Sequence, residues 1–131
     1  EKKYVLEAIL DKKGNLKKIV KIIHKEIRKK MSVFLKKNSH RKIVILDIPL
    51  LLENKINNKN FILIYVQSKK SEILKRLKKR KNFNQKLFRK FKKIQLPLDY
   101  KKKKSNFIIK NNFNESTVQK YVKNITKEIL R

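Results

Sequence analysis

The 131-residue sequence contains no cysteine and only one glycine, Gly14. The lack of cysteine excludes disulfides and thiolate metal sites. No apolar run approaches the roughly 20 residues of a membrane-spanning helix, and no signal peptide is visible. These absences lead us to expect a cytoplasmic protein with no membrane partner.

Acidic residues are also scarce: 10 Asp and Glu stand against 39 Lys and Arg, giving a formal net charge of +29. One explanation is a polyanionic partner such as nucleic acid, a membrane surface or a phosphorylated ligand. The other is compositional drift, because Lys, Asn and Ile are all abundant and Arg, the residue suited to planar phosphate recognition, is the minor cation. We favour drift over a dedicated nucleic-acid function, and the charge still favours anionic substrates.

The sequence starts at Glu1, and its single methionine, Met31, is internal. A chain of this size with one glycine is also short of the residue that tight turns and phosphate-binding loops require. We therefore expect this chain to be a piece of a longer protein.

Hydrophobic periodicity predicts helices alternating with short apolar strands. The predicted strands are 43–48, 61–66 and 107–109. Helices are predicted over 1–10, from Gly14 to a break at 36–41, after a cap at Ser68, from Asn84 to a stop before Pro97, and from a capping box of Ser116 and Gln119. The alternation predicts an α/β fold with a parallel sheet whose strands are buried on both faces. Three strands make a thin sheet, so we expect upstream sequence to supply the rest.

Two carboxylates follow the first predicted strand, at Asp47 and Glu53, on either side of Pro49. Ligands of open α/β sheets bind outside the carboxyl ends of the strands, and an acid there can hold Mg²⁺ in nucleotide-binding proteins. Asp47 could equally be a simple cap of the next turn. The spacing does not decide between these two roles.

A second candidate site is basic. Residues 75–104 contain fifteen Lys or Arg and one acid, and Arg76 and Arg80 are four apart on one helix face. Paired guanidinium groups can clamp phosphates, although a solvated basic face is the commoner outcome. His24 and Arg28 share another helix, where a lone histidine is more often structural than ligand-binding. No metal site based on histidine and no covalent nucleophile is supported.

Four stretches of the chain are similar to segments of one protein family, and they occur in the same order as in that family. They are IIHKEIRKKM (22–31), LDIPLLLEN (46–54), ILKRLKKRKN (73–82) and SNFIIKNN (105–112). Together they resemble dephospho-CoA kinase, the last enzyme of coenzyme A synthesis. The second stretch resembles a Pro-Leu-Leu-x-Glu segment, the third carries an arginine pair, and Gln95 falls where the family has a glutamine closing its lid helix. The resemblance covers essentially the whole chain.

The resemblance implies a P-loop NTPase-like three-layer parallel sheet with a helical lid, here truncated at the N-terminus. It implies one partial kinase domain over 1–131, with a basic lid at approximately 76–104. The implied reaction transfers the γ-phosphoryl of ATP to the ribose 3′-hydroxyl of dephospho-CoA, with Mg²⁺. Arg80 would act in the lid over ATP, and Asp47 is a possible Mg²⁺ ligand. The residues implied to bind the acceptor substrate are His24, Arg28, Pro49, Leu50, Glu53 and Arg76. The resemblance also implies a helix around His24 and another after Pro49, both facing that substrate.

The sequence departs from the family at several points. Lys25 replaces a usual proline, Ser105 and Asn106 replace an Ala-Asp pair, and Leu98 stands near a usual basic residue. A P-loop needs two glycines, so this chain cannot contain one, and the family's acidic motif carrying the probable general base is missing too. We predict that the chain alone does not turn over ATP. Two alternative functions are a basic nucleic-acid-binding module and a non-catalytic kinase-like remnant.

Overall fold

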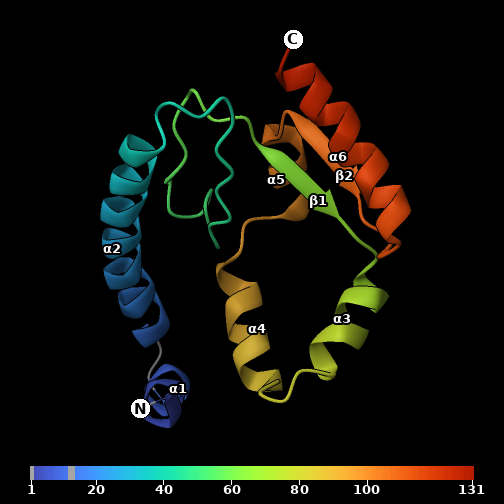
Figure 1. Cartoon of the computed structure of the whole chain (residues 1–131). Helices are drawn as coiled ribbons and strands as arrows, with labels where there is room; N and C mark the ends of the chain where they lie inside the picture. The colour runs from blue at the N-terminus through green and yellow to red at the C-terminus, as the bar shows by residue number, and fades with distance from the viewer. Residues whose placement is uncertain (1, 12–13) are drawn as a thin grey trace. The chain divides into compact units, whose positions relative to one another are not determined.

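The computed structural model describes residues 2–11 and 14–131. The chain divides into two compact units, the first comprising Glu1–Asn57 with Asn84–Gln95 and the second comprising Asn58–Phe83 with Leu96–Arg131. Figure 1 traces the order of elements along the chain. Each unit is a separate body and has its own small set of buried residues.

The first unit opens with two helices, α1 (Lys2–Asp11) and α2 (Asn15–Lys37), as the periodicity predicted. Gly14 sits between them with φ 108°, in the left-handed region where only glycine is unstrained. The last carbonyls of α1, those of Ile9 and Leu10, accept hydrogen bonds from Lys90 Nζ at 2.6 and 2.8 Å. A cation there satisfies free carbonyls and complements the helix dipole.

Lys90 belongs to α4 (Gln85–Ile94), the third helix of this unit. Asn84 caps it as predicted, because its side-chain oxygen accepts a hydrogen bond from Leu87 N at 2.9 Å. The helix ends at Ile94, and Gln95 is its C-cap, two residues before Pro97. Its apolar side chains recur on one face, which is half-buried.

Two predictions fail between α2 and the second unit. Residues 43–48 form no strand, since no strand of the described residues pairs with them, and Ile45 is 84% exposed. The residues after Pro49 form turns instead of a helix, because Leu50 and Lys55 adopt positive φ values of 55° and 50°. A non-glycine residue there costs about 1–2 kcal/mol, which must be offset by other contacts.

The second unit contains a parallel pair of strands, β1 (Ile64–Gln67) and β2 (Phe107–Lys110). Their register places Val66 opposite Ile109. The parallel arrangement is confirmed, but the sheet has two strands among the described residues where three were predicted. Burial on both faces is also wrong: Ile64 and Val66 are 43% and 55% exposed. These two residues are two apart and so share one face of β1, and that face is open to solvent.

Three helices accompany this strand pair: α3 (Lys70–Lys78), α5 (Leu98–Lys104) and α6 (Glu115–Ile129). Figure 1 shows α6 running beside β2, against which it packs. Buried Ile109 and Ile125 lie on these two elements. The unit is therefore a small parallel α/β body, which confirms the fold class at that level.

Two predicted helix caps are wrong. The N-cap of α3 is Lys69, with no side-chain hydrogen bond, and Ser68 does not cap it. The N-cap of α6 is Asn114, whose side-chain oxygen accepts from Thr117 N at 3.2 Å and from Ser116 Oγ at 2.7 Å. Asn114, two residues before Ser116, competes successfully with the serine for the cap. Across residues 2–11 and 14–131, every helix is too short or too polar to span a bilayer.

Candidate functional site

His24 and Arg28 lie one turn apart on α2, and both contact the same residue, Asn54. The Asn54 side-chain nitrogen lies 3.2 Å from His24 Nε2. Arg28 Nη2 donates a hydrogen bond of 2.7 Å to the Asn54 carbonyl oxygen. Spacing of four residues on a helix directs both side chains to one side, which explains the shared partner. The helix is thereby tied to the end of the LDIPLLLEN stretch.

His24 is the buried polar residue of this cluster, with 6% of its surface exposed. Its Nδ1 atom is buried and has no hydrogen-bond partner among the described residues. A buried polar atom without a partner costs about 1–3 kcal/mol, so such atoms are uncommon unless something else is gained. The other ring nitrogen, Nε2, is the one that meets Asn54.

A tight turn presents Asn54 to α2. The Leu50 carbonyl accepts two hydrogen bonds from Asn54, one from its backbone N at 3.1 Å and one from its side chain at 3.0 Å. Ile56, the next buried residue, donates its N–H to Leu51 O at 3.1 Å. The left-handed backbone of Leu50 aims its carbonyl into this network, which offsets the cost of its conformation.

A cavity of about 320 Å³ opens next to this turn, within the first unit. Its apolar lining comes from Val20, Leu50 and Ile94. The charged and polar lining residues are Lys17 and Lys21 of α2, Lys93 of α4, and Glu53 and Asn54 of the turn. Three ammonium groups around a partly apolar floor suit a ligand that carries phosphate together with a less polar portion.

Asp47 and Pro49 are exposed, and neither lines this cavity. No group of three or more Asp, Glu, His or Cys side chains that could hold a metal occurs among residues 2–11 and 14–131. A single exposed carboxylate fills at most one of the near-octahedral positions that Mg²⁺ demands. Asp47 could therefore supply at most one of the ligands of such an ion.

The arginine pair lies in the second unit, on and after α3. Arg76 donates from Nη1 to Glu72 Oε2 at 2.7 Å, and its guanidinium lies 3.5 Å from the centroid of the Phe113 ring. Phe113 has φ 62°, again in the left-handed region. Arg80 follows the end of α3 and is exposed. Arg76 is thus held by an acid and an aromatic ring, whereas Arg80 is open to solvent.

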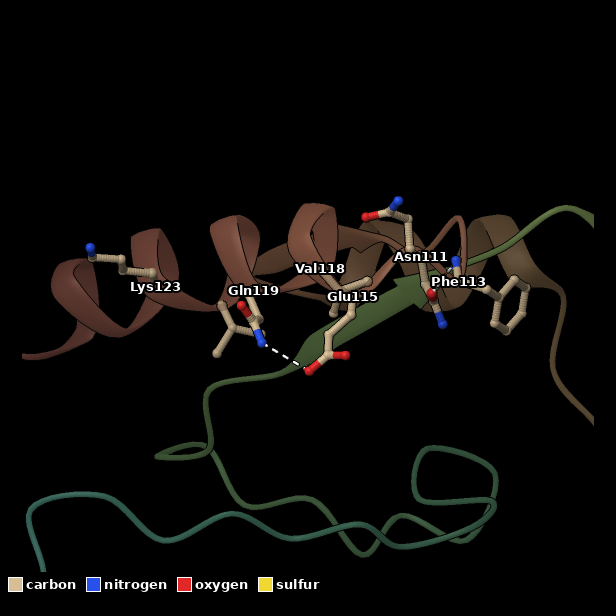
Figure 2. Close-up of a pocket in the computed structure, with 8 residues that line it drawn as sticks. Asn111, Phe113, Glu115, Val118, Gln119 and Lys123 are labelled. Carbon is tan, nitrogen blue, oxygen red and sulfur yellow. Dashed lines mark hydrogen bonds between the residues drawn. The ribbon is translucent and has the colours of Figure 1, made fainter.

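A second cavity, of about 540 Å³, lies along the first turns of α6 and the segment that precedes it, within this unit (Figure 2). Asn111 and Phe113 border one end, and Val118, Val122 and Lys123 continue along the helix. Gln119 donates to Glu115 at 3.0 Å across one turn, as Figure 2 shows. Asn111 is also used locally, because its Oδ1 accepts a hydrogen bond from Phe113 N at 2.8 Å.

The predicted residues therefore fall into two groups. His24, Arg28, Leu50 and Glu53 gather around the turn of the first unit, and Arg76 and Arg80 belong to the second. Sequence reasoning missed Asn54 and the cavity lysines Lys17, Lys21 and Lys93. Asn54 carried one available signal, its position directly after the glutamate of the Pro-Leu-Leu-x-Glu segment.

Comparison with known proteins assigns the lineage. A sequence model of dephospho-CoA kinase matches residues 1–117 of this chain. The chain belongs to the dephospho-CoA kinase family. Dephospho-CoA kinases similar to it come from Wolbachia sp. subsp. Brugia malayi (26% identical), Wolbachia pipientis wMel (27%) and Fusobacterium nucleatum subsp. nucleatum (30%).

The alignments with these three dephospho-CoA kinases cover 98%, 88% and 98% of this chain, in the same order. They cover 67%, 60% and 66% of the relatives, so the chain spans about two thirds of their length. The family match reaches from α1 into α6 and so includes the Asn54 cluster, the three-lysine cavity and the Arg76 contacts.

Proposed function

We propose that this chain carries the part of a dephospho-CoA kinase that binds the phosphoryl-accepting substrate. The reaction would transfer the γ-phosphoryl of ATP to the ribose 3′-hydroxyl of dephospho-CoA, giving coenzyme A. The observation that carries the proposal is the cavity of the first unit, in a chain whose family match spans 117 of its 131 residues. Its three lysines and apolar floor suit a substrate with phosphates, a nucleoside and a long, less polar arm.

The assigned roles follow from charge and position. In the first unit, Arg28 and His24 would stabilise the turn, and Leu50 and Glu53 would border the substrate, with Pro49 fixing the chain direction before the turn. In the second unit, Arg76 would serve the acceptor substrate. Arg80 and the basic segment 76–104 would close as a lid over the ATP phosphates. Phosphoryl transfer depends mainly on positioning and on neutralising charge spread over the transferred group.

The proposed fold of the complete catalytic body is the three-layer P-loop NTPase sheet, of which the parallel β1–β2 pair would be one portion. ATP would enter as its Mg²⁺ complex, with the metal held chiefly by the substrate phosphates. Asp47 is a candidate for one further ligand. No step of the proposal passes through a metal held by this chain alone.

The 131-residue chain is proposed to bind dephospho-CoA without turning over ATP. A glycine-rich loop wraps phosphates with backbone N–H groups, and the single glycine here, Gly14, caps α2 instead. Incubation with Mg·ATP and dephospho-CoA should therefore give no coenzyme A. Production of coenzyme A by this chain alone would refute the inactivity.

The binding proposal is tested by titrating dephospho-CoA into the chain, with duplex DNA as competitor. We expect saturable binding that DNA does not displace. Lys17→Ala combined with Lys21→Ala should weaken binding roughly tenfold or more, because each loses a contact to a charged oxygen. Lys18→Ala is the matched control: it removes an exposed lysine of the same helix that does not line the cavity.

The net charge of +29 favours one competing function, a basic nucleic-acid-binding module. That function predicts DNA binding with a steep dependence on salt and with a similar loss for each of the three lysine substitutions, Lys18→Ala included. Salt-sensitive DNA binding without saturable binding of dephospho-CoA would replace the kinase proposal by this one. Saturable substrate binding by a chain that remains inactive with any added partner would instead favour a non-catalytic remnant.

A further inference from the structure

The side chain of Asn54 is oriented by two neighbours at once. Its amide nitrogen lies 3.0 Å from the Leu50 carbonyl oxygen and 3.2 Å from His24 Nε2. An amide nitrogen carries two hydrogens and accepts none, so it donates to both. If the amide were turned over, its oxygen would face the Leu50 carbonyl, and two acceptors would repel. The Leu50 carbonyl therefore fixes which end of the amide meets the histidine.

This orientation also fixes the tautomer of His24. Because Asn54 donates, Nε2 of His24 must accept, and in that tautomer the ring proton is on Nδ1. The ring is 6% exposed, and His24 is not among the residues that line the 320 Å³ cavity. His24 therefore lies behind Asn54 and out of reach of a ligand in that cavity.

Asn54, by contrast, does line the cavity. Both hydrogens of its amide are used, by Leu50 and His24, and no hydrogen bond among the described residues uses its side-chain oxygen Oδ1. The side chain thus offers the cavity an acceptor and no free donor. The lining lysines supply only donors and Glu53 is a carboxylate, so Oδ1 adds a neutral acceptor to the charged groups of the cavity.

We infer that Asn54 is a substrate-contacting residue whose Oδ1 accepts a hydrogen bond from a neutral O–H or N–H group of the ligand, and that His24 is the positioning residue that holds it. This inference rests on the proposed function for the identity of the ligand, dephospho-CoA, which offers ribose hydroxyl and amide N–H donors. It reverses the expectation that His24 itself touches the substrate.

The arrangement predicts a selective pocket. The ammonium groups attract any anion, whereas an acceptor held in one orientation favours ligands that place a donor beside their phosphates. Inorganic pyrophosphate carries the charge without the donor on a neutral group. Asn54 should therefore contribute to the affinity for dephospho-CoA and contribute little to the affinity for pyrophosphate.

The first test is nitrogen-detected NMR of the histidine ring in the ligand-free chain. We expect His24 to carry its proton on Nδ1. In the Asn54→Ala variant, the ring should no longer prefer this tautomer. A proton on Nε2 in the unmodified chain would overturn the inference. This measurement needs no ligand, so it remains decisive for the orientation of Asn54 even if dephospho-CoA does not bind and the proposed function fails.

The second test is a double-mutant cycle on the binding of dephospho-CoA. Asn54→Ala should weaken binding about tenfold, His24→Ala by a similar factor, and the double variant by no more than Asn54→Ala alone, since His24 acts through Asn54. Pyrophosphate binding should change less than twofold in each. Asn57→Ala, an exposed asparagine of the same unit outside the cavity lining, is the matched control.

Two results would contradict the inference while leaving the proposed function intact. One is dephospho-CoA binding to the unmodified chain and equally well to Asn54→Ala. The other is losses for His24→Ala and Asn54→Ala that multiply in the double variant, which would indicate that both side chains touch the ligand independently.

Discussion

The two units hold their candidate functional residues in opposite ways. In the first, His24 is 6% exposed and meets an amide that is itself fixed by a backbone carbonyl. In the second, Arg76 keeps 46% of its side chain exposed while it pairs with Glu72 and stacks on Phe113. A buried polar contact cannot be replaced by water, whereas an exposed one can. Breaking the contacts of His24 should therefore lower the stability of the protein more than breaking those of Arg76, and Arg76 can exchange its partners more readily.

The largest effect on stability should come from His24. Replacing it by alanine removes a buried ring, leaves a void, and deprives one hydrogen of the Asn54 amide of its acceptor. We expect His24→Ala to lower the free energy of unfolding by about 2–3 kcal/mol. Chemical denaturation combined with hydrogen exchange of α2 would measure this, and a loss below about 1 kcal/mol would mean that the cluster is not packed as described.

A smaller effect is expected at the caps, which compare the two units on equal terms. Asn84 caps α4 in the first unit and Asn114 caps α6 in the second. Alanine at either position should cost about 1 kcal/mol, because one backbone N–H of the first turn loses its partner. Ser116→Ala should cost less than Asn114→Ala in thermal unfolding. A larger loss of stability for Ser116→Ala than for Asn114→Ala would instead indicate that Ser116 is the cap.

Arg76 should matter still less for stability. Its ion pair with Glu72 is exposed and its stack on Phe113 is a surface contact, so Arg76→Ala should lower the free energy of unfolding by about 0.5–1 kcal/mol. Arg76→Lys retains the charge and should recover part of that loss. Added salt should reduce the difference in unfolding free energy between the unmodified chain and Glu72→Ala. A loss of stability for Arg76→Ala as large as that for His24→Ala would contradict the contrast between the two units.

The smallest effect is expected at Phe113. Glycine there would relieve the strain of φ 62°, but it would also remove the ring beneath Arg76 and add freedom to the unfolded chain. Relief of the left-handed conformation gains about 1–2 kcal/mol, whereas the lost ring contact and the freer unfolded chain each cost about 0.5–1 kcal/mol, so Phe113→Gly should leave the unfolding free energy nearly unchanged. NMR order parameters of the Arg76 side chain should nevertheless fall; an unchanged guanidinium would show that the ring does not hold it.

Local signals in the sequence predicted more of the helices than of the strands or of the site. The cap at Asn84 and the stripe of α4 depend on residues within one helix, and both are confirmed. Residues 43–48 had the composition of a strand, but a strand also needs a neighbour, and pairing is decided far away in sequence. Composition alone therefore led us to predict a strand of the sheet in a segment that is apolar but partly exposed.

The same reasoning explains what was missed in the candidate site. His24 and Arg28 stood out by residue type and spacing, but their shared partner, Asn54, is 30 residues beyond His24. The turn that presents it depends on left-handed conformations at Leu50 and Lys55, residues that rarely adopt them. The roles of the predicted site residues stay predictions until substrate binding is measured.

Binding of dephospho-CoA followed residue by residue with amide NMR tests the central claim most directly. We expect saturable shifts concentrated at Lys17, Lys21 and residues 50–54, unchanged when duplex DNA is added. Shifts spread over the lysine-rich surface, without saturation and abolished by salt or DNA, would contradict it and leave only a basic chain that binds polyanions.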